Sequence, residues 1–284
     1  MDEFIFQDIR TAFSRFPRME SGSGRRRLRR SPPPDGDRFR RQRGHGGGTD
    51  LISDLPDEML LLVLAGLSCI RTTVHTGLLS RRWRGLWARL PDLTFRYVPP
   101  GAIEAALSRV ALPAAVSLLD IRFPGFSSPA WGKAGDVRAK SLLRAAARLA
   151  PEEFVLALPG HLCSPSVDVD LSCFHRTTSI ELDSCLLFLR VSAGVDFPAL
   201  ETLSLSCFLP DLDSFIPCCP RLRTLRLGSL FLGVLRLNSV LLQEIVVDRE
   251  AGLTDHISIV APVLRQLTMS FISSNPSISV SAPM

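Results

Sequence analysis

The chain has 284 residues, enough for one or two domains with a sizeable buried core. Its 46% hydrophobic and 21% charged residues are ordinary for a globular protein and argue against a chain that is disordered throughout. The net charge of +5 arises in residues 1–49, which hold 12 Arg against 6 Asp or Glu, so the remainder of the chain is close to neutral.

Cysteine usage and apolar runs indicate the compartment. The seven Cys include no CxxC pair, and no secretory signal precedes them, so neither disulfides nor a zinc site is expected. The longest apolar run, 59–67, has 9 residues, about half of what a membrane span needs. We expect a soluble protein of the cytoplasm, the nucleus or both, with no metal, no cofactor and no membrane partner.

Residues 1–49 are predicted to be a disordered tail, because Arg, Gly, Ser and Pro dominate the stretch 21–48. The basic run 25–30 (RRRLRR) fits a nuclear import signal, a nucleic-acid-binding arm or a solvated linker. Residues 1–18 resemble a transit peptide in their apolar pattern, but their acidic residues argue against one. Whether these 18 residues are genuine stays open, since Met19 is an equally plausible start.

Residues 50–95 are predicted to be compact and helical. Asp54 is a good N-cap for a first helix, Pro56 suits its first turn, and an apolar stripe runs to Leu67. A short second helix should end at Gly77. A third should run from Ser80 to Pro91, with an apolar face made by Trp83, Leu86, Trp87 and Leu90.

Short apolar strands with a regular spacing are predicted for residues 115–284. Four segments share a frame with apolar residues at the first, fourth and sixth positions: 200–205, 222–227, 242–247 and 264–269, with a weaker fifth at 177–182. Their interval of 20–23 residues is typical of leucine-rich repeats. Upstream we expect strands at 116–123, 154–158 and 167–171 and a helix at 137–150. An ordinary β-rich domain with coincidental spacing is the alternative.

Motifs of the common catalytic classes are missing from the sequence. It contains no GxSxG, GxxxxGK[ST] or HExxH pattern, and its five His residues are scattered. The alternating acids Asp168, Asp170, Glu181 and Asp183 suit outward-facing strand positions, and Cys218 and Cys219 suit packing. The sequence therefore favours a binding protein over a hydrolase or transferase.

Two half-motifs give the segment 50–95 a family resemblance. Leu55-Pro56-Asp57-Glu58, followed about two dozen residues later by 79–87 (LSRRWRGLW), resembles the F-box motif of the plant F-box/leucine-rich-repeat family. The implied fold is α+β, with a three-helix F-box at 50–95 and an irregular leucine-rich-repeat solenoid at 115–284. Ser68 and Cys69 depart from the family pattern, in which proline is common after the preceding Leu.

The resemblance implies a non-catalytic adaptor of a ubiquitin ligase. Its F-box would dock a SKP-family adaptor and, through it, a cullin. Matched to the motif, the expected contact residues are Leu55, Pro56, Asp57, Leu60, Leu64, Leu67, Leu79, Ser80 and Trp83. Trp87 fits either the same contact or, by a slight preference, the seal between the F-box and the first repeat.

The repeats would present their variable polar positions to an unidentified target protein. The positions singled out are Glu201, Ser204, Arg223, Arg226, Gln243 and Arg265. Related plant proteins often continue into a further C-terminal domain, so whether the C-terminus of this chain is truncated stays open. The competing hypothesis is a leucine-rich-repeat scaffold that acts outside a ligase, with its basic tail on nucleic acid; the ligase hypothesis includes no nucleic-acid partner.

Overall fold

The computed structural model describes residues 55–67, 69–78, 80–110, 116–123, 135–158, 167–171, 174–190, 194–208, 212–228, 234–248, 256–270 and 277–281. They belong to two compact units, Met1–Leu67 and Ser68–Met284. The predicted tail 1–49, Asp54, Ser68 and Leu79 lie outside the described residues. The domain boundaries inferred from sequence stay a prediction.

The first unit contains the helix α2 (Asp57–Ala65), whose N-cap is Pro56. The carbonyl oxygen of Pro56 accepts the N–H groups of Met59 and Leu60 at 3.1 and 3.2 Å. The prediction that Asp54 caps this helix is wrong. A proline disfavours the helical conformation for the residue before it, which agrees with a helix that starts after Pro56.

The second unit begins with α3 (Ile70–Thr76), the predicted short second helix, which ends at Gly77 as expected. Its first turn is fixed by the carbonyl oxygen of Cys69. That oxygen accepts the hydroxyl groups of Thr72 and Thr73 at 2.6 and 3.1 Å. Hydroxyl groups thus anchor a helix start that has no side-chain N-cap.

Residues 81–89 form two 3-10 turns, η1 (Arg81–Trp83) and η2 (Leu86–Arg89), and the predicted third α-helix is wrong. Gly85 between them adopts a left-handed conformation with φ of 83°, which breaks the helical path. The segment begins at Ser80 as predicted, and Ser80 Oγ accepts the N–H of Arg82 at 3.3 Å. The predicted apolar side chains are also buried, namely Trp83, Leu86, Trp87 and Leu90.

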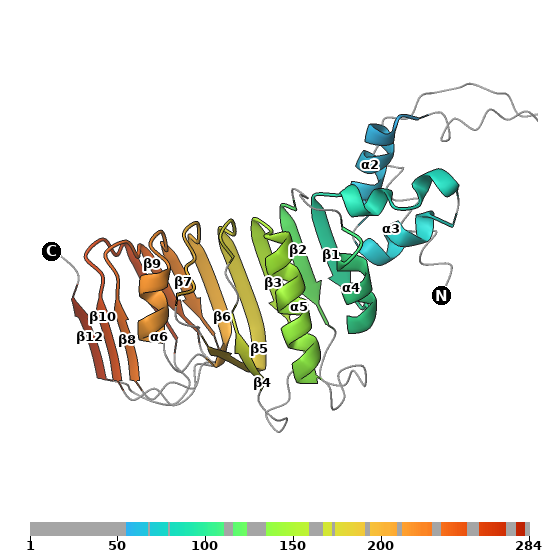
Figure 1. The fold of residues 1–284 in the computed structure, drawn as a ribbon. Coiled ribbons are helices and arrows are strands. Elements are labelled where there is room, and N and C mark those ends of the chain that lie inside the picture. Colours follow the sequence, from blue (N-terminus) through green and yellow to red (C-terminus); the bar gives the residue numbers. More distant parts are fainter. Residues whose placement is uncertain are drawn as a thin grey trace, which may run out of the picture. The chain divides into compact units, whose positions relative to one another are not determined.

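A nine-stranded parallel sheet dominates the described part of the second unit (Figure 1). Its strands are β1 (Asp92–Arg96), β2 (Leu118–Arg122), β3 (Glu153–Ala157), β4 (Val167–Asp170), β5 (Ser179–Arg190), β6 (Thr202–Phe208), β7 (Thr224–Leu227), β9 (Glu244–Val247) and β11 (Gln266–Met269). They follow chain order across the sheet, with β4 paired only to the end of β5. The predicted strands are all present, and β1 extends the sheet into the segment 50–95.

The apolar frame read from the sequence is the inner side of this sheet. Ile180, Leu203, Leu225, Ile245 and Leu267 are register partners from strand to strand. The first four of these side chains are fully buried. The same alignment continues upstream through β3, β2 and β1, where the spacing in sequence is too uneven to be recognised.

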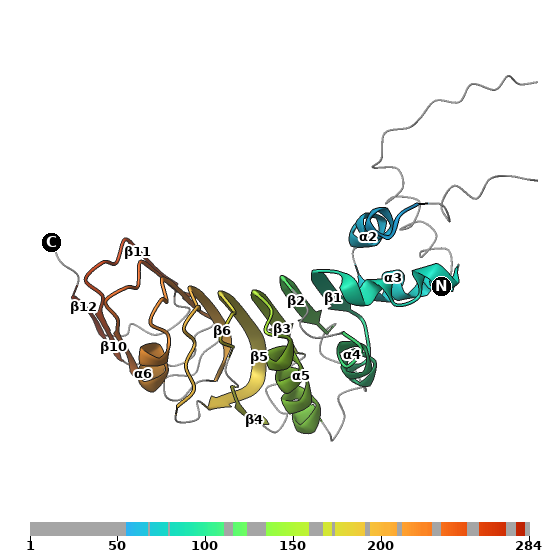
Figure 2. The ribbon, with the colours of Figure 1, turned by 45° about the horizontal axis from the view of Figure 1, so that its top comes forward.

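The inner side is covered by different elements along the sheet (Figure 2). The helices are α4 (Pro100–Leu107), α5 (Gly135–Leu149) and α6 (Leu212–Phe215), the last continuing into η4 (Ile216–Cys218). Towards the C-terminus a second parallel sheet takes over, made of β8 (Val234–Asn238), β10 (His256–Val260) and β12 (Ser277–Ser281). Only α5 of these elements was predicted.

The described structure therefore mixes helices and strands, which confirms the α+β class. Among the described helices, none combines the length and the apolar character that crossing a membrane requires.

Candidate functional site

In the first unit the predicted adaptor-binding residues fall into two groups. Pro56 is exposed, and Leu55 and Asp57 are half-buried. By contrast, Leu60 and Leu64 are fully buried and Leu67 is 9% exposed. The first group is accessible to a partner, whereas the second is covered by other residues of the chain. Their shared role as contacts stays a prediction.

The large apolar side chains exposed on α2 are Met59 and Leu62, at 40% and 59% exposure. They lie three residues apart and so share one side of the helix, next to the buried stripe of Leu60, Val63 and Leu64. The sequence-based selection missed both. Their signal was present, since a nine-residue apolar run is too broad for one buried stripe.

In the second unit, Ser80 is half-buried and Trp83 is 6% exposed. Trp87 is equally buried, which favours its packing role. The exposed apolar residues nearby are Val74 at 43% and Leu78 at 78%. These two were also missed from sequence.

The side of the main sheet that faces away from the helices is the open face. Its central row runs from strand to strand in register through Thr94, Asp120, Val155, Glu181, Ser204, Arg226, Val246 and Thr268. Because side chains alternate across a strand, these residues point away from the buried frame. The row is polar at six of its eight positions, as is usual for a sheet face open to water.

The structure separates the six predicted target-binding residues into two sets. Ser204 and Arg226 are neighbours in the central row, and Arg226 Nη2 lies 3.4 Å from Glu244 Oε1. Each of the other four directly precedes its strand. Together they form a column across the N-terminal ends of the strands, consisting of Glu201, Arg223, Gln243 and Arg265. Successive backbone hydrogen bonds of 2.8–2.9 Å join this column.

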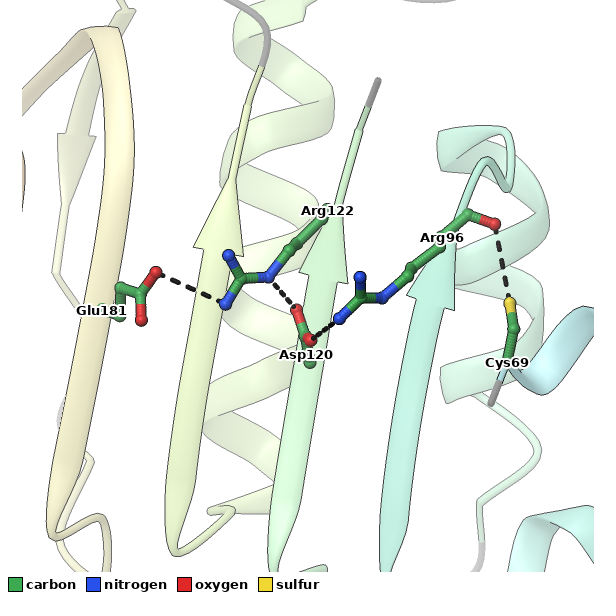
Figure 3. Close-up of polar contacts among 5 residues, drawn as sticks. All are labelled: Cys69, Arg96, Asp120, Arg122 and Glu181. Carbon is green, nitrogen blue, oxygen red and sulfur yellow. Dashed lines mark hydrogen bonds and ion pairs between the residues drawn. The ribbon is translucent and has the colours of Figure 1, made fainter. Parts of the chain in front are cut away.

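A buried carboxylate organises the other end of the open face (Figure 3). Asp120 is 6% exposed, although its side chain belongs to the central row of the open face. Arg96 Nη2 and Arg122 Nε donate to its two oxygens at 3.3 and 2.9 Å. Arg122 Nη2 also reaches Glu181 Oε1 at 3.4 Å.

The ion pairs of this cluster link β1, β2 and β5. The side chain of Arg122 extends past β3 to Glu181, and the β3 residues beside this path are the small Val155 and Ala157. Cys69 Sγ donates to the carbonyl oxygen of Arg96 at 3.6 Å, so the chain before α3 is tied to the same strand (Figure 3). Sequence analysis did not select the cluster, because its members are scattered over more than 80 positions and meet only through strand pairing.

Burial makes the thiols of Cys207 and Cys219 poor nucleophiles at neutral pH. Burial, and then the charge of Asp183, raises the pKa of the Cys207 thiol. Burial together with Cys218 and Asp196 raises the pKa of Cys219 to about 12. Within the described residues, no group of three or more His, Cys, Asp or Glu side chains is placed to hold a metal ion.

Comparison with known proteins finds relatives among plant F-box proteins. A putative FBD-associated F-box protein of Arabidopsis thaliana is 52% identical over 44 residues, which are 16% of this chain and 10% of that protein. An F-box/LRR-repeat protein of the same plant is 38% identical over 68 residues, or 23% and 15% of the two chains. A longer match, to an FBD-associated F-box protein, is 28% identical over 188 residues, or 62% and 45%. The chain is related to the plant F-box/LRR-repeat proteins.

These F-box relatives are longer than the matched regions. In the three comparisons the chain spans 10–45% of the relative's length. No family model matches the chain. No solved structure matches it either.

Proposed function

We propose that the chain is the substrate-recognition adaptor of a SKP–cullin–F-box ubiquitin ligase, and that it has no catalytic role of its own. The observation that carries the proposal is the 52% identity over 44 residues to a protein named for its F-box. The half-motifs at 55–58 and 79–87 support it, because they are the residues by which the chain resembles an F-box.

The docking step would use both motif segments. Pro56, Met59 and Leu62 are exposed on or beside α2, and such unpartnered apolar side chains are suited to burial against a SKP-family adaptor. The buried Leu60, Leu64 and Trp83 would hold the docking segments in shape. In interfaces of this kind a few apolar anchors dominate, each costing about 2 kcal/mol or more when truncated.

The recognition step would use the open face. We propose that the parallel strands and their buried frame are degenerate leucine-rich repeats, whose outward positions read a target protein. Ser204 and Arg226 would contact the target from the central row. The column at the N-terminal ends of the strands would add contacts from Glu201, Arg223, Gln243 and Arg265. A target held there would be ubiquitinated because it stays close to the charged ubiquitin carrier on the cullin.

Calorimetric titration of the whole chain with a plant SKP adaptor tests the docking step. We expect Leu62→Glu to weaken binding at least tenfold, because a carboxylate replaces an apolar contact, and Pro56→Glu to do the same. Leu241→Glu is the matched control: Leu241 is also exposed, at 44%, but lies in the turn after β8. It should leave the affinity unchanged.

A folded wild-type chain that does not bind the SKP adaptor would rule out the ligase role. The chain would then be a repeat scaffold that acts outside a ligase. Loss of binding in the control as well as in Leu62→Glu would show that the effect of the carboxylate is not local to α2.

A further inference from the structure

The open face carries more acidic than basic side chains. Three rows of outward positions cross the sheet from β1 to β11, the central row and one on either side of it. They hold three Arg against seven acids, a balance of −4, the acids being Asp92, Asp120, Glu153, Glu181, Asp183, Glu244 and Asp248. Residues 50–284 as a whole hold 21 Lys or Arg against 22 Asp or Glu, so negative charge is concentrated on this face.

The three arginines of the face are already paired with its own acids. Arg96 and Arg122 both bind Asp120, and Arg226 Nη2 lies 3.4 Å from Glu244 Oε1. Four of the seven acids lie outside the ion pairs described above, and all four are exposed, namely Asp92, Glu153, Asp183 and Asp248. The excess negative charge is therefore presented to solvent.

The exposure of these acids does not depend on where the sheet ends. Glu153, Asp183 and Asp248 belong to or directly follow β3, β5 and β9. Each of these strands has a neighbouring strand on both sides within the sheet. Because the helices cover the other side, the outward acids face away from the core (Figure 2).

The outward residues of β9 indicate which side chains fit this face. They are Glu244, Val246 and Asp248, so a half-buried apolar side chain lies between two carboxylates. On β3, Glu153 likewise stands next to Val155 on the outward side. Arg and Lys combine an apolar stem with a charged head. Such a side chain can lay its stem over the valine and its head beside a carboxylate.

Small residues separate Asp183 from Asp248 in the row that both share. Ser206 and Gly228 lie between them, and backbone hydrogen bonds of 2.8 Å from Gly228 and Asp248 continue the row past the ends of β7 and β9. A Cβ on Gly228 would come within 2.5 Å of Ser206 Oγ, so a larger side chain would displace the serine. Two carboxylates thus stand about 14 Å apart, three strand spacings, with only small side chains between them in the row.

We propose that the open face binds a basic, extended segment of the target protein, with Asp183 and Asp248 as its main contacts. The inference rests on the proposed role of this face in target recognition and adds the chemistry of the target. Opposite charge on the two partners favours encounter and suppresses wrong partners. An acidic segment or the phosphates of a nucleic acid would instead meet an excess of like charge.

Calorimetric titration of the whole chain with two synthetic peptides tests the proposal. One peptide alternates Arg with Ser over about ten residues, ~33 Å when extended and so long enough to reach both carboxylates. The other has Glu in place of Arg. We expect the Arg peptide to bind and the Glu peptide not to bind.

Variants of single acids locate the peptide on the molecule. Asp183→Asn and Asp248→Asn should each weaken the Arg peptide about threefold or more, as the loss of one exposed ion pair does. Both side chains are exposed, so the variants should fold normally. Asp213→Asn is the control, because Asp213 is an exposed acid of α6 on the other side of the sheet. It should leave the affinity unchanged.

Titration of the same preparation with the SKP adaptor separates this inference from the proposed ligase role. A chain that binds the adaptor but does not prefer the Arg peptide overturns this inference alone. So do Asp183→Asn and Asp248→Asn variants that bind the Arg peptide no more weakly than Asp213→Asn does. A chain that prefers the Arg peptide but does not bind the adaptor keeps its basic partner and loses the ligase role.

Discussion

The thiol of Cys219 donates to the carbonyl oxygen of Phe215 at 3.6 Å and is buried. Burial, Cys218 and Asp196 raise its pKa from 9.0 to about 12. The folded chain therefore holds this proton over a pH range in which the unfolded chain releases it. Stability must then fall as pH rises above about 9, because the unfolded state gains from ionisation and the folded state does not.

Cys219→Ala should remove this pH dependence. Between pH 8 and pH 10 the wild-type chain should lose about 1.4 kcal/mol more unfolding free energy than the variant, because one unit of pH beyond the unfolded pKa is worth that amount. Urea unfolding at the two pH values measures the difference. The lost side-chain packing affects the variant equally at both pH values and cancels. Equal losses in both chains would contradict the pKa of about 12.

The burial of Asp120, whose side chain lies on the outward side of the sheet, also depends on neighbouring residues. Its carboxylate is buried on the open face by two arginine side chains, and its two oxygens each accept one guanidinium donor. From sequence, an acid between Leu119 and Ile121 reads as an ordinary solvated strand residue. Its burial depends on Arg96, which is brought alongside only by the pairing of β1 with β2.

At the scale of elements, residues 81–89 show where periodicity misleads. The spacing of Trp83, Leu86, Trp87 and Leu90 fits one α-helix, and all four are buried. The backbone instead makes two short turns around Gly85. Turns of about three residues place side chains on one side nearly as well as a helix does, so the pattern of burial is preserved although the helix is not.

Gly85 and Gly101 should respond oppositely to the same substitution. A Cβ at either position meets no atom within 4 Å, so any difference comes from the backbone. Gly85→Ala should lower the unfolding free energy by about 1 kcal/mol, because φ is +83° there. Gly101→Ala lies within α4 and should raise it by about 0.5–1 kcal/mol. Thermal unfolding of the two variants compares them, and a stabilising Gly85→Ala would contradict the left-handed turn.

At the scale of the whole second unit, the contribution of a strand to stability should depend on its place in the sheet. Each strand is supported by its two neighbours, so interior strands are held on both sides and terminal strands on one. Ile257 and Ile278 provide a direct comparison, because they are register partners with the same side chain. One is fully buried and the other is 49% exposed.

Ile257→Ala should cost about 3 kcal/mol, as expected for a large-to-small change in a packed core. Ile278→Ala should cost about 1 kcal/mol or less, since its side chain is already half in water. Denaturant unfolding of the two variants gives both values. Equal costs would mean that the Ile278 side chain is covered in solution.

The sequence alone determined the features that rest on local pattern. The frame of Leu203, Leu225 and Ile245 predicted strands that the structure pairs in register, because a repeated apolar spacing has one efficient way to be buried. The half-motifs around Leu55 and Trp83 pointed to the F-box/LRR relatives, and the breaks at Gly77 and Pro91 follow from backbone chemistry.

Tertiary structure decided what depends on partners distant in the chain. β1, α4 and the strands of the second sheet were not predicted, since an alternation of about five residues, as in 234–238, is a weak signal beside the repeated frame of the main sheet. The burial of Asp120 and the exposure of Ile278 were equally out of reach. A side chain's identity sets what it gains by burial, but only the packed neighbours decide whether it is covered.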